Sequence, residues 1–173
     1  MRILPTHIRP TRGFTLLELM VTVAVAAILA VIAIPSFTSF IAGQQAKTGA
    51  HDLFLDLLYA RSEAIKLNDE VYVTATDNDW ANGWVVTTIS GKTYAQCTAD
   101  LNGCMKLQEA IPNVTFAATA TSVTYRGNGR IAAGTAPTFT VCDSKASGSV
   151  PKRVVRMGLT GRPGIILDGD CSS

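Results

Sequence analysis

A long apolar run near the N-terminus constrains the fold of this chain more than any other feature. Residues 14–34 form a stretch of 21 residues with one charge, that of Glu18, and Arg2, Arg9 and Arg12 precede it. At about 1.5 Å per residue, a helix of this length covers roughly 30 Å, the thickness of a bilayer core. The basic flank predicts that the N-terminus stays on the cytoplasmic side of a membrane.

The position of the small residues separates this run from a secretory signal peptide. A signal peptide has a small-residue cleavage site after its apolar stretch, whereas this run ends in the sequence AVIAIPSF. The small residue Gly13 stands before the run instead. The remaining alternative from the residues alone is a plain membrane anchor in which the Gly-Phe pair is a coincidence.

Glu18 is the unusual residue of the run, because a carboxylate costs up to about 3 kcal/mol at the centre of a bilayer and less near its edge. It lies one helical turn inside Phe14, about 6 Å along the helix axis. One interpretation is that Glu18 reaches back to the lipid headgroups. The other is that it pairs with a cation, such as a newly formed α-amino group.

The segment Arg12-Gly13-Phe14-Thr15-Leu16-Leu17-Glu18 resembles the class III signal of type IV pilins and pseudopilins, and the similarity continues without a gap to Pro35. The resemblance implies that a prepilin peptidase cuts between Gly13 and Phe14 and methylates the new amine of Phe14. It also implies that Glu18 pairs with the N-terminal amine of a neighbouring subunit, and that Pro35 distorts the helix. A buried ion pair of this kind specifies register more than it adds stability.

A second apolar pattern predicts that the helix continues beyond Pro35 to about residue 67. Pro35 lacks a backbone donor, so the helix bends or loosens there. Afterwards, apolar residues recur in steps of three and four, which places them on one stripe: Ala50, Leu53, Phe54, Leu57, Leu58, Ala60, Ala64 and Ile65. The charged residues lie mostly off this stripe: Asp52, Asp56, Arg61, Glu63 and Lys66.

After residue 70 the pattern becomes that of β-strands. Strands are predicted at residues 71–76 and 84–89, and weaker ones at 114–117, 122–125, 138–142, 154–159 and 164–167. The sequence Gly127-Asn128-Gly129 predicts a hairpin turn. The predicted fold class is α+β: a long N-terminal transmembrane and assembly helix packed on a C-terminal antiparallel β-sheet domain, similar to type IV pilins. The predicted parts are a leader at 1–13, the transmembrane and assembly half of the helix at 14–42, and a periplasmic globular domain at 43–173.

Within the pilin-like proteins, the globular part resembles the GspH/FimT/FimU branch at residues 56–65, at 80–84 and at Gly161-Arg162. From the residues alone, core packing is favoured over ligand binding for Trp80 and Trp84. Arg61 is either a surface residue or a donor to loop backbone.

Four cysteines, Cys97, Cys104, Cys142 and Cys171, allow three disulfide connectivities in an exported chain. We favour Cys97–Cys104 and Cys142–Cys171, because each bond would close a local loop or the tail. In the cytoplasm the same residues would be reduced thiols. The cysteines form no CxxC pair and the two histidines have no zinc spacing, so no metal or cofactor is predicted. No nucleophile has a histidine arranged to activate it, so no enzymatic activity is predicted.

The net charge of +2 conceals a basic C-terminal part, because residues 126–173 alone carry +4. Candidate residues for binding the phosphates of DNA are Lys152, Arg153, Arg156 and Arg162, with Arg126 and Arg130 if the fold gathers them. A solvated surface of mixed charge is the alternative. In the FimT proteins that this chain resembles, DNA binding goes with a Gly-Arg-x-Arg pattern. This chain has Gly161-Arg162-Pro163-Gly164 at that place and lacks the second arginine.

The resemblance implies a minor pilin of the type IV pilus, a non-catalytic subunit of the filament or its tip complex. Such a subunit primes pilus assembly and supports twitching motility, adhesion or DNA uptake. It would wait in the inner membrane as a single-pass protein, with other minor and major pilins and the prepilin peptidase as partners. Two alternatives stay open: a type II secretion pseudopilin of the GspH kind, and a DNA-binding minor pilin. The basic tail and the disulfide loops favour the pilus over the secretion system.

Overall fold

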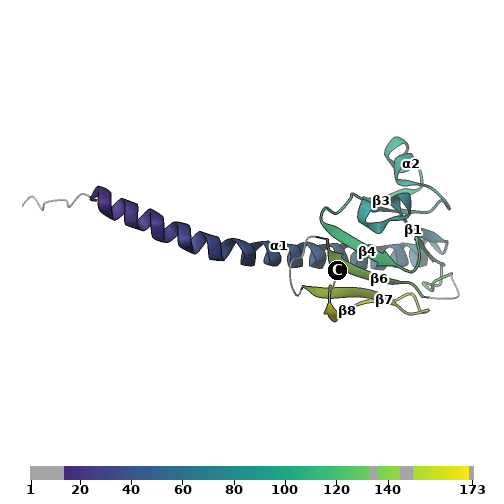
Figure 1. The fold of residues 1–173 in the computed structure, drawn as a ribbon. Coiled ribbons are helices and arrows are strands. Elements are labelled where there is room, and N and C mark those ends of the chain that lie inside the picture. Colours follow the sequence, from purple (N-terminus) through teal and green to yellow (C-terminus); the bar gives the residue numbers. More distant parts are fainter. Residues whose placement is uncertain (1–13, 133–135, 145–149, 172–173) are drawn as a thin grey trace, which may run out of the picture. The chain divides into compact units, whose positions relative to one another are not determined.

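A computed structural model describes residues 14–132, 136–144 and 150–171, without the side chains of residues 33–39 and 42 (Figure 1). The predicted leader, including Gly13, lies outside the described residues. The chain divides into two compact units, one ending at Phe37 and the other beginning at Thr38. Helix α1, Leu16–Leu67, contributes to both units.

Helix α1 begins with a side-chain cap and ends with a left-handed residue. The hydroxyl oxygen of Thr15 accepts a hydrogen bond from the backbone N–H of Glu18 at 3.2 Å, as an N-cap residue does. The negative charge of Glu18 in the first turn suits the positive end of the helix dipole. Asn68 follows the last helical residue with a φ of 52°, a conformation that commonly ends helices. Position 35 lies within α1, so Pro35 does not end the helix.

In the part of the chain that the structure describes, eight strands form two four-stranded antiparallel sheets. The first sheet has the order β3-β2-β1-β5 and consists of β1 Val71–Ala75, β2 Trp84–Thr87, β3 Cys104–Gln108 and β5 Ser122–Tyr125. The second has the order β4-β6-β7-β8 and consists of β4 Val114–Ala118, β6 Thr138–Asp143, β7 Pro151–Met157 and β8 Pro163–Asp170. The predicted α+β class with antiparallel sheets is confirmed.

Short helices and tight turns connect these strands. Two 3₁₀ turns, η1 Thr76–Asn78 and η2 Trp80–Asn82, separate β1 from β2, and α2, Tyr94–Ala99, lies between β2 and β3. The predicted hairpin turn after β5 is present, because the N–H of Gly129 donates to the carbonyl of Arg126 at 2.7 Å and Tyr125 pairs with Ile131. Helix α2 and strand β3 were not predicted from the sequence.

The core lies between the C-terminal part of α1 and both sheets. Residues of α1 that pack in it are Ala50, Leu53, Leu57, Ala60 and Ala64, and the sheets contribute buried side chains that include Val73, Tyr125, Phe139 and Val155. The predicted stripe was too wide: Phe54 and Leu58 are only partly buried, and Ile65 is exposed. Asp56, predicted to lie off the stripe, is buried.

Two disulfide bonds join Cys97 to Cys104 and Cys142 to Cys171, the connectivity favoured from the sequence. Their loops differ in length, with sequence separations of 7 and 29 residues. In the chain-entropy model the longer loop contributes about 3.6 kcal/mol and the shorter about 2.4 kcal/mol.

We therefore expect that replacing Cys142 and Cys171 with serine lowers the free energy of unfolding by about 1 kcal/mol more than replacing Cys97 and Cys104. Urea unfolding of the two double variants in detergent, followed by tryptophan fluorescence, measures the difference. An equal loss in both variants, or a larger loss in the Cys97 and Cys104 variant, would contradict this ranking.

Candidate assembly interface

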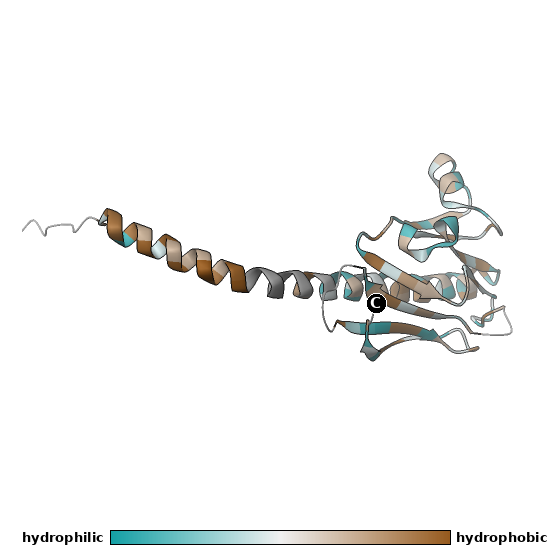
Figure 2. Ribbon diagram, in the orientation of Figure 1, coloured by the Kyte–Doolittle hydropathy of each residue, from teal (hydrophilic) through white to brown (hydrophobic). Residues whose placement is uncertain are grey.

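The N-terminal part of α1 presents apolar side chains on all sides. Every residue from Phe14 to Ile32 is exposed, and Figure 2 shows that the hydrophobic colouring of this segment is interrupted at few positions. Among the residues whose side chains are described, no helix is both long enough and apolar enough to cross a membrane. A contiguous apolar surface of this kind marks a site of contact with other molecules. We call residues 14–32 the apolar segment.

The few polar side chains of the apolar segment differ in how they are satisfied. The hydroxyl of Thr22 donates to the carbonyl of Leu19 at 2.8 Å, so covering it costs little. The hydroxyl of Thr15 caps the helix. Glu18 carries a full charge, and covering it with apolar side chains is costly unless a cation pairs with it. The geometry therefore makes Glu18 the residue of the segment that most requires a charged partner.

A buried carboxylate connects α1 to the first sheet. One oxygen of Asp56, Oδ2, accepts a hydrogen bond from Nε1 of Trp84 on β2 at 2.9 Å, and the other forms an ion pair with Nζ of Lys106 on β3. Asp56 and Trp84 are buried, and the side chain of Lys106 is partly exposed. Asp52 lies one turn earlier, where burial and then repulsion by Asp56 raise its pKa. The carboxylate of Asp56 thus holds the helix against two adjacent strands.

A second connection joins the end of α1 to the hairpin after β5 and to the turn before β8. Nε of Arg61 donates to the carbonyl of Gly129 at 3.0 Å, so Arg61 binds loop backbone. Gly161 has a φ of 77°, and a Cβ atom there would lie 2.2 Å from the same carbonyl oxygen. Glycine is therefore required at position 161, which explains the Gly161-Arg162 motif by packing.

The two tryptophans belong to the core, as the sequence analysis favoured. Nε1 of Trp80 donates to the carbonyl of Ala120 at 2.8 Å, and its ring packs edge-on against Phe139 with centroids 4.9 Å apart. Trp84 packs against Phe116 in a similar geometry, with centroids 6.0 Å apart. Both indole N–H groups are thus satisfied inside the protein.

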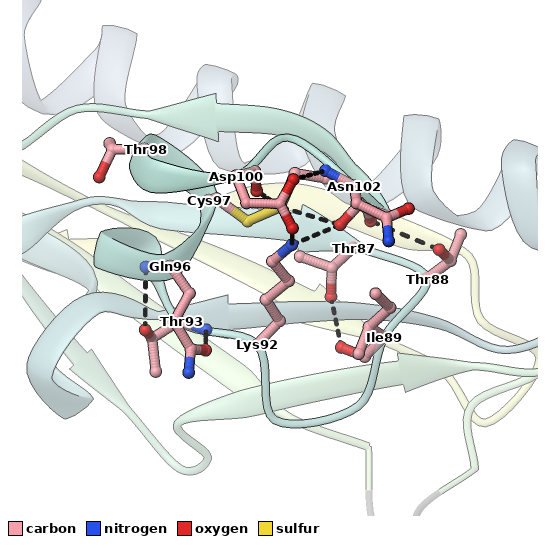
Figure 3. A network of polar contacts seen from close by, with 12 residues as sticks. Thr87, Thr88, Ile89, Lys92, Thr93, Gln96, Cys97, Thr98, Asp100 and Asn102 are labelled. Atoms are coloured by element: carbon pink, nitrogen blue, oxygen red, sulfur yellow. Dashed lines mark hydrogen bonds and ion pairs between the residues drawn. A yellow bond between two sulfur atoms is a disulfide. The ribbon is translucent and has the colours of Figure 1, made fainter.

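The segment that connects β2 to β3, residues 88–103, is stabilised by its own polar contacts and by a disulfide bond (Figure 3). The side chain of Lys92 is only 9% exposed, and its ammonium binds the carbonyl of Asn102 and the carboxylate of Asp100. Thr93 and Gln96 form a reciprocal capping box at the start of α2. A shallow cavity of about 470 Å³ lies beside these residues, and Lys92 is already committed to its two acceptors.

The four candidate DNA-binding residues do not share one face. Side chains alternate along β7, so Arg153 lies on the side of the buried Val155, and Lys152 and Arg156 lie on the other side. Burial lowers the pKa of Arg153. Arg156 forms an ion pair with Asp168 at 3.5 Å, and Arg162 is exposed before β8.

Comparison with known proteins identifies the family. The family model described as "Type II transport protein GspH" matches residues 49–161. The chain belongs to the GspH family. A second model, the prokaryotic N-terminal methylation motif, matches residues 8–34, which include Gly13, Phe14 and Glu18. The chain is therefore a member of the type IV pilin-like proteins, in the group of minor pilins and pseudopilins.

The chain is also similar to curated proteins and, in its fold, to solved structures. Two proteins of Pseudomonas aeruginosa named "Fimbrial protein" are each 35% identical over 101 residues, covering 56% of this chain and 65% of the relative. The crystal structure of the type IV minor pilin FimU of the same species aligns with a TM-score of 0.60 at 22% identity, covering 77% of this chain and 99% of FimU. The minor pseudopilin EpsH of Vibrio cholerae aligns with a TM-score of 0.49 at 14% identity, covering 72% and 97%.

Within the part of the chain that the structure describes, no group of three or more histidine, cysteine or acidic side chains is placed to hold a metal ion. The structure brings Asp56, Trp84 and Lys106 together, which sequence reasoning missed. The signal for this contact was weak, because Asp56 lies next to the apolar stripe and Lys106 lies in a strand that the pattern did not predict.

Proposed function

We propose that this chain is a minor pilin of the type IV pilus, a non-catalytic subunit that joins the filament or its tip complex through the apolar segment. In this proposal the peptidase cleaves between Gly13 and Phe14 and methylates Phe14. The mature subunit is anchored in the inner membrane by its N-terminal helix, with its sheets in the periplasm. The observation that carries the proposal is the methylation motif at residues 8–34 on a helix whose apolar side chains are exposed all round.

The assembly step follows from the chemistry of that helix. Packing the apolar segment among similar helices removes apolar area from water, at roughly 25 cal/mol for each Å² covered. The same packing removes water from Glu18, and the α-amine of a neighbouring Phe14 offsets that cost. Because each Glu18 pairs with one Phe14 amine, the ion pair fixes the axial register between neighbouring helices. Pro35 removes one backbone hydrogen-bond donor from the helix.

Deletion of the gene, followed by counting of surface pili and assay of protein secretion, tests this function. We expect that surface pili are lost and that secretion is unchanged. Restoration of pili by the wild-type chain supplied from a plasmid is the control. Normal numbers of pili in the deletion strain would contradict a role in priming assembly.

A second candidate function is that of a type II secretion pseudopilin, which the description of the matching family model favours. The leader, helix and sheets are shared by both classes, so they do not separate them. The relatives named "Fimbrial protein" favour the pilus. Loss of secretion with surface pili intact, in the same deletion strain, would select the pseudopilin.

DNA binding by the basic C-terminal region stays a prediction from the charge of the sequence. A mobility-shift assay on the mature chain in detergent, at two salt concentrations, tests it, because phosphate contacts weaken steeply with salt. A shift at low salt that disappears at high salt would support binding to phosphates. The absence of a shift at low salt would remove this role.

A further inference from the structure

The chain contains three Asn-Gly pairs, which lie in three different connections between strands. They are Asn82-Gly83 before β2, Asn102-Gly103 before β3 and Asn128-Gly129 in the hairpin after β5. An Asn-Gly pair can lose ammonia in water without an enzyme, because glycine has no Cβ to hinder the approach of its backbone nitrogen to the preceding side chain. The fold decides which pair reacts, since the nitrogen must be accessible and the side chain must be able to turn towards it.

Two of the three pairs are held in contacts that oppose this reaction. The N–H groups of Gly83 and Gly129 donate to backbone carbonyls of their own turns, at 3.2 Å and 2.7 Å, and both glycines are buried. Oδ1 of Asn128 also accepts a hydrogen bond from the N–H of Arg130 at 3.0 Å, which fixes that side chain. Reaction at either pair would first have to break these hydrogen bonds.

The pair Asn102-Gly103 lacks such contacts among the described residues. Its two residues are the centre of a turn that the N–H of Cys104 closes on the carbonyl of Leu101 at 2.9 Å, so the turn does not use the N–H of Gly103. Within the described ranges, neither this N–H nor the side-chain amide of Asn102 forms a hydrogen bond. Asn102 is exposed and Gly103 is only partly buried. The side chain of Asn102 can therefore turn towards the nitrogen of Gly103.

Lys92 is bound to the peptide group of this pair (Figure 3). Its ammonium binds the carbonyl oxygen of Asn102, and that carbonyl belongs to the same peptide group as the nitrogen of Gly103. The nitrogen attacks after it has lost its proton, and a cation on the carbonyl oxygen stabilises the resulting anion. The side chain of Lys92 is only 9% exposed, so water screens its charge little. Asp100 lies 3.4 Å from the ammonium and is 68% exposed, so it offsets this effect only in part.

We propose that Asn102 is a site of spontaneous modification, at which the backbone nitrogen of Gly103 attacks the side-chain amide and Lys92 promotes the attack. A bond forms between the nitrogen of Gly103 and Cγ of Asn102, and the bond from Cγ to the amide nitrogen breaks. The amide leaves as ammonia, with the proton that the nitrogen of Gly103 gives up. Water then opens the succinimide ring at one of its two carbonyls and leaves aspartate or isoaspartate at position 102. This chemistry is independent of the proposed function.

The modification changes both the charge and the backbone of the segment between β2 and β3. A neutral amide becomes a carboxylate, which lowers the formal net charge of the chain from +2 to +1. Isoaspartate also adds one carbon to the backbone inside the loop that the Cys97–Cys104 bond closes. The modified chain is therefore separable from the unmodified chain by charge as well as by mass.

Incubation of the folded full chain in detergent at mildly alkaline pH, followed by peptide mass spectrometry at successive times, tests the proposal. We expect Asn102 to be converted roughly tenfold faster than Asn82 or Asn128, which corresponds to about 1.4 kcal/mol of activation free energy. In urea, after reduction of the disulfide bonds, the three rates should become similar, because all three asparagines precede glycine. A rate at Asn102 that does not exceed the other two in the folded chain would overturn the proposal.

Variants of Lys92 test its part in the reaction. The change Lys92→Gln removes the charge and is expected to slow conversion of Asn102 by roughly tenfold, whereas Lys92→Arg keeps the charge and should retain most of the rate. The matched control is Lys66→Gln, because Lys66 is 70% exposed and paired with Glu63, and it should leave the rate at Asn102 unchanged.

The thermal midpoint of each variant shows whether the chain is folded. If Lys92→Gln lowers the midpoint, Lys92→Met, which keeps an unbranched side chain without the charge, replaces it. An undiminished rate at Asn102 in a folded variant without the charge would contradict the role of Lys92. If neither uncharged variant folds, loss of the rate difference between wild type and Lys92→Arg decides for the charge, and a much slower Lys92→Arg decides against it.

Discussion

Replacing Glu18 with leucine is expected to lower the amount of this chain in sheared filaments by roughly a hundredfold. In the assembled helices, leucine would leave the amine of a neighbouring Phe14 without its carboxylate partner. Removing one member of a buried ion pair costs about 3–5 kcal/mol, and each 1.4 kcal/mol is about a factor of ten in an equilibrium. Quantitative immunoblotting of sheared filaments and of membranes measures the ratio of assembled subunit to subunit that remains in the membrane.

A matched substitution on the same segment controls for damage to the helix. Thr22 is exposed and its hydroxyl is bonded to the backbone of its own helix. The change Thr22→Ala should therefore leave incorporation within about twofold of wild type. If Glu18→Leu is incorporated as well as Thr22→Ala, the carboxylate has no pairing role in assembly.

Replacing Asp56 with alanine is expected to destabilise the second unit by about 1–3 kcal/mol. The change leaves Nε1 of buried Trp84 without an acceptor and Nζ of Lys106 without its counter-charge. It also releases α1 from β2 and β3 at the same point. Urea unfolding in detergent, followed by the fluorescence of the two buried tryptophans, measures the loss.

Asp52 provides the control for Asp56, because it is an acid on the same helix whose charge lowers the stability of the folded chain. Its pKa is raised from 3.8, so the charged form is less favourable in the folded chain than in the unfolded chain. The destabilisation is present at neutral pH and disappears as pH falls below about 3.8. We therefore expect Asp52→Asn to be at least as stable as wild type at pH 7. A loss as large as that of Asp56→Ala would contradict the special role of Asp56.

The features that local sequence determines were predictable. The helix, its end near residue 67 and seven of the strands follow from apolar periodicity and from β-branched runs bounded by turn residues. The exceptions, α2 and β3, depend on specific contacts more than on a local pattern. Strand β3, Cys-Met-Lys-Leu-Gln, has no β-branched residue and is defined by pairing with β2. Helix α2 has six residues and depends on its capping box and on the Cys97–Cys104 bond.

The contacts of the candidate site were only partly predictable. The exposed apolar segment and Glu18 are visible in the sequence, because their pattern is local. Asp56 lies 50 residues from Lys106, and no periodicity signals that the two side chains meet. The basic residues of β7 were grouped by sequence proximity, but alternation along the strand places Arg153 on the opposite face from Lys152 and Arg156.

The most direct test of the account is mass spectrometry of the mature chain purified from membranes. We predict that its first residue is Phe14, that residues 1–13 are absent, and that the N-terminal amine carries one methyl group. A strain without the prepilin peptidase should yield the chain with its leader attached. A mature chain that begins at any residue other than Phe14 would contradict the claim that this helix is processed for assembly.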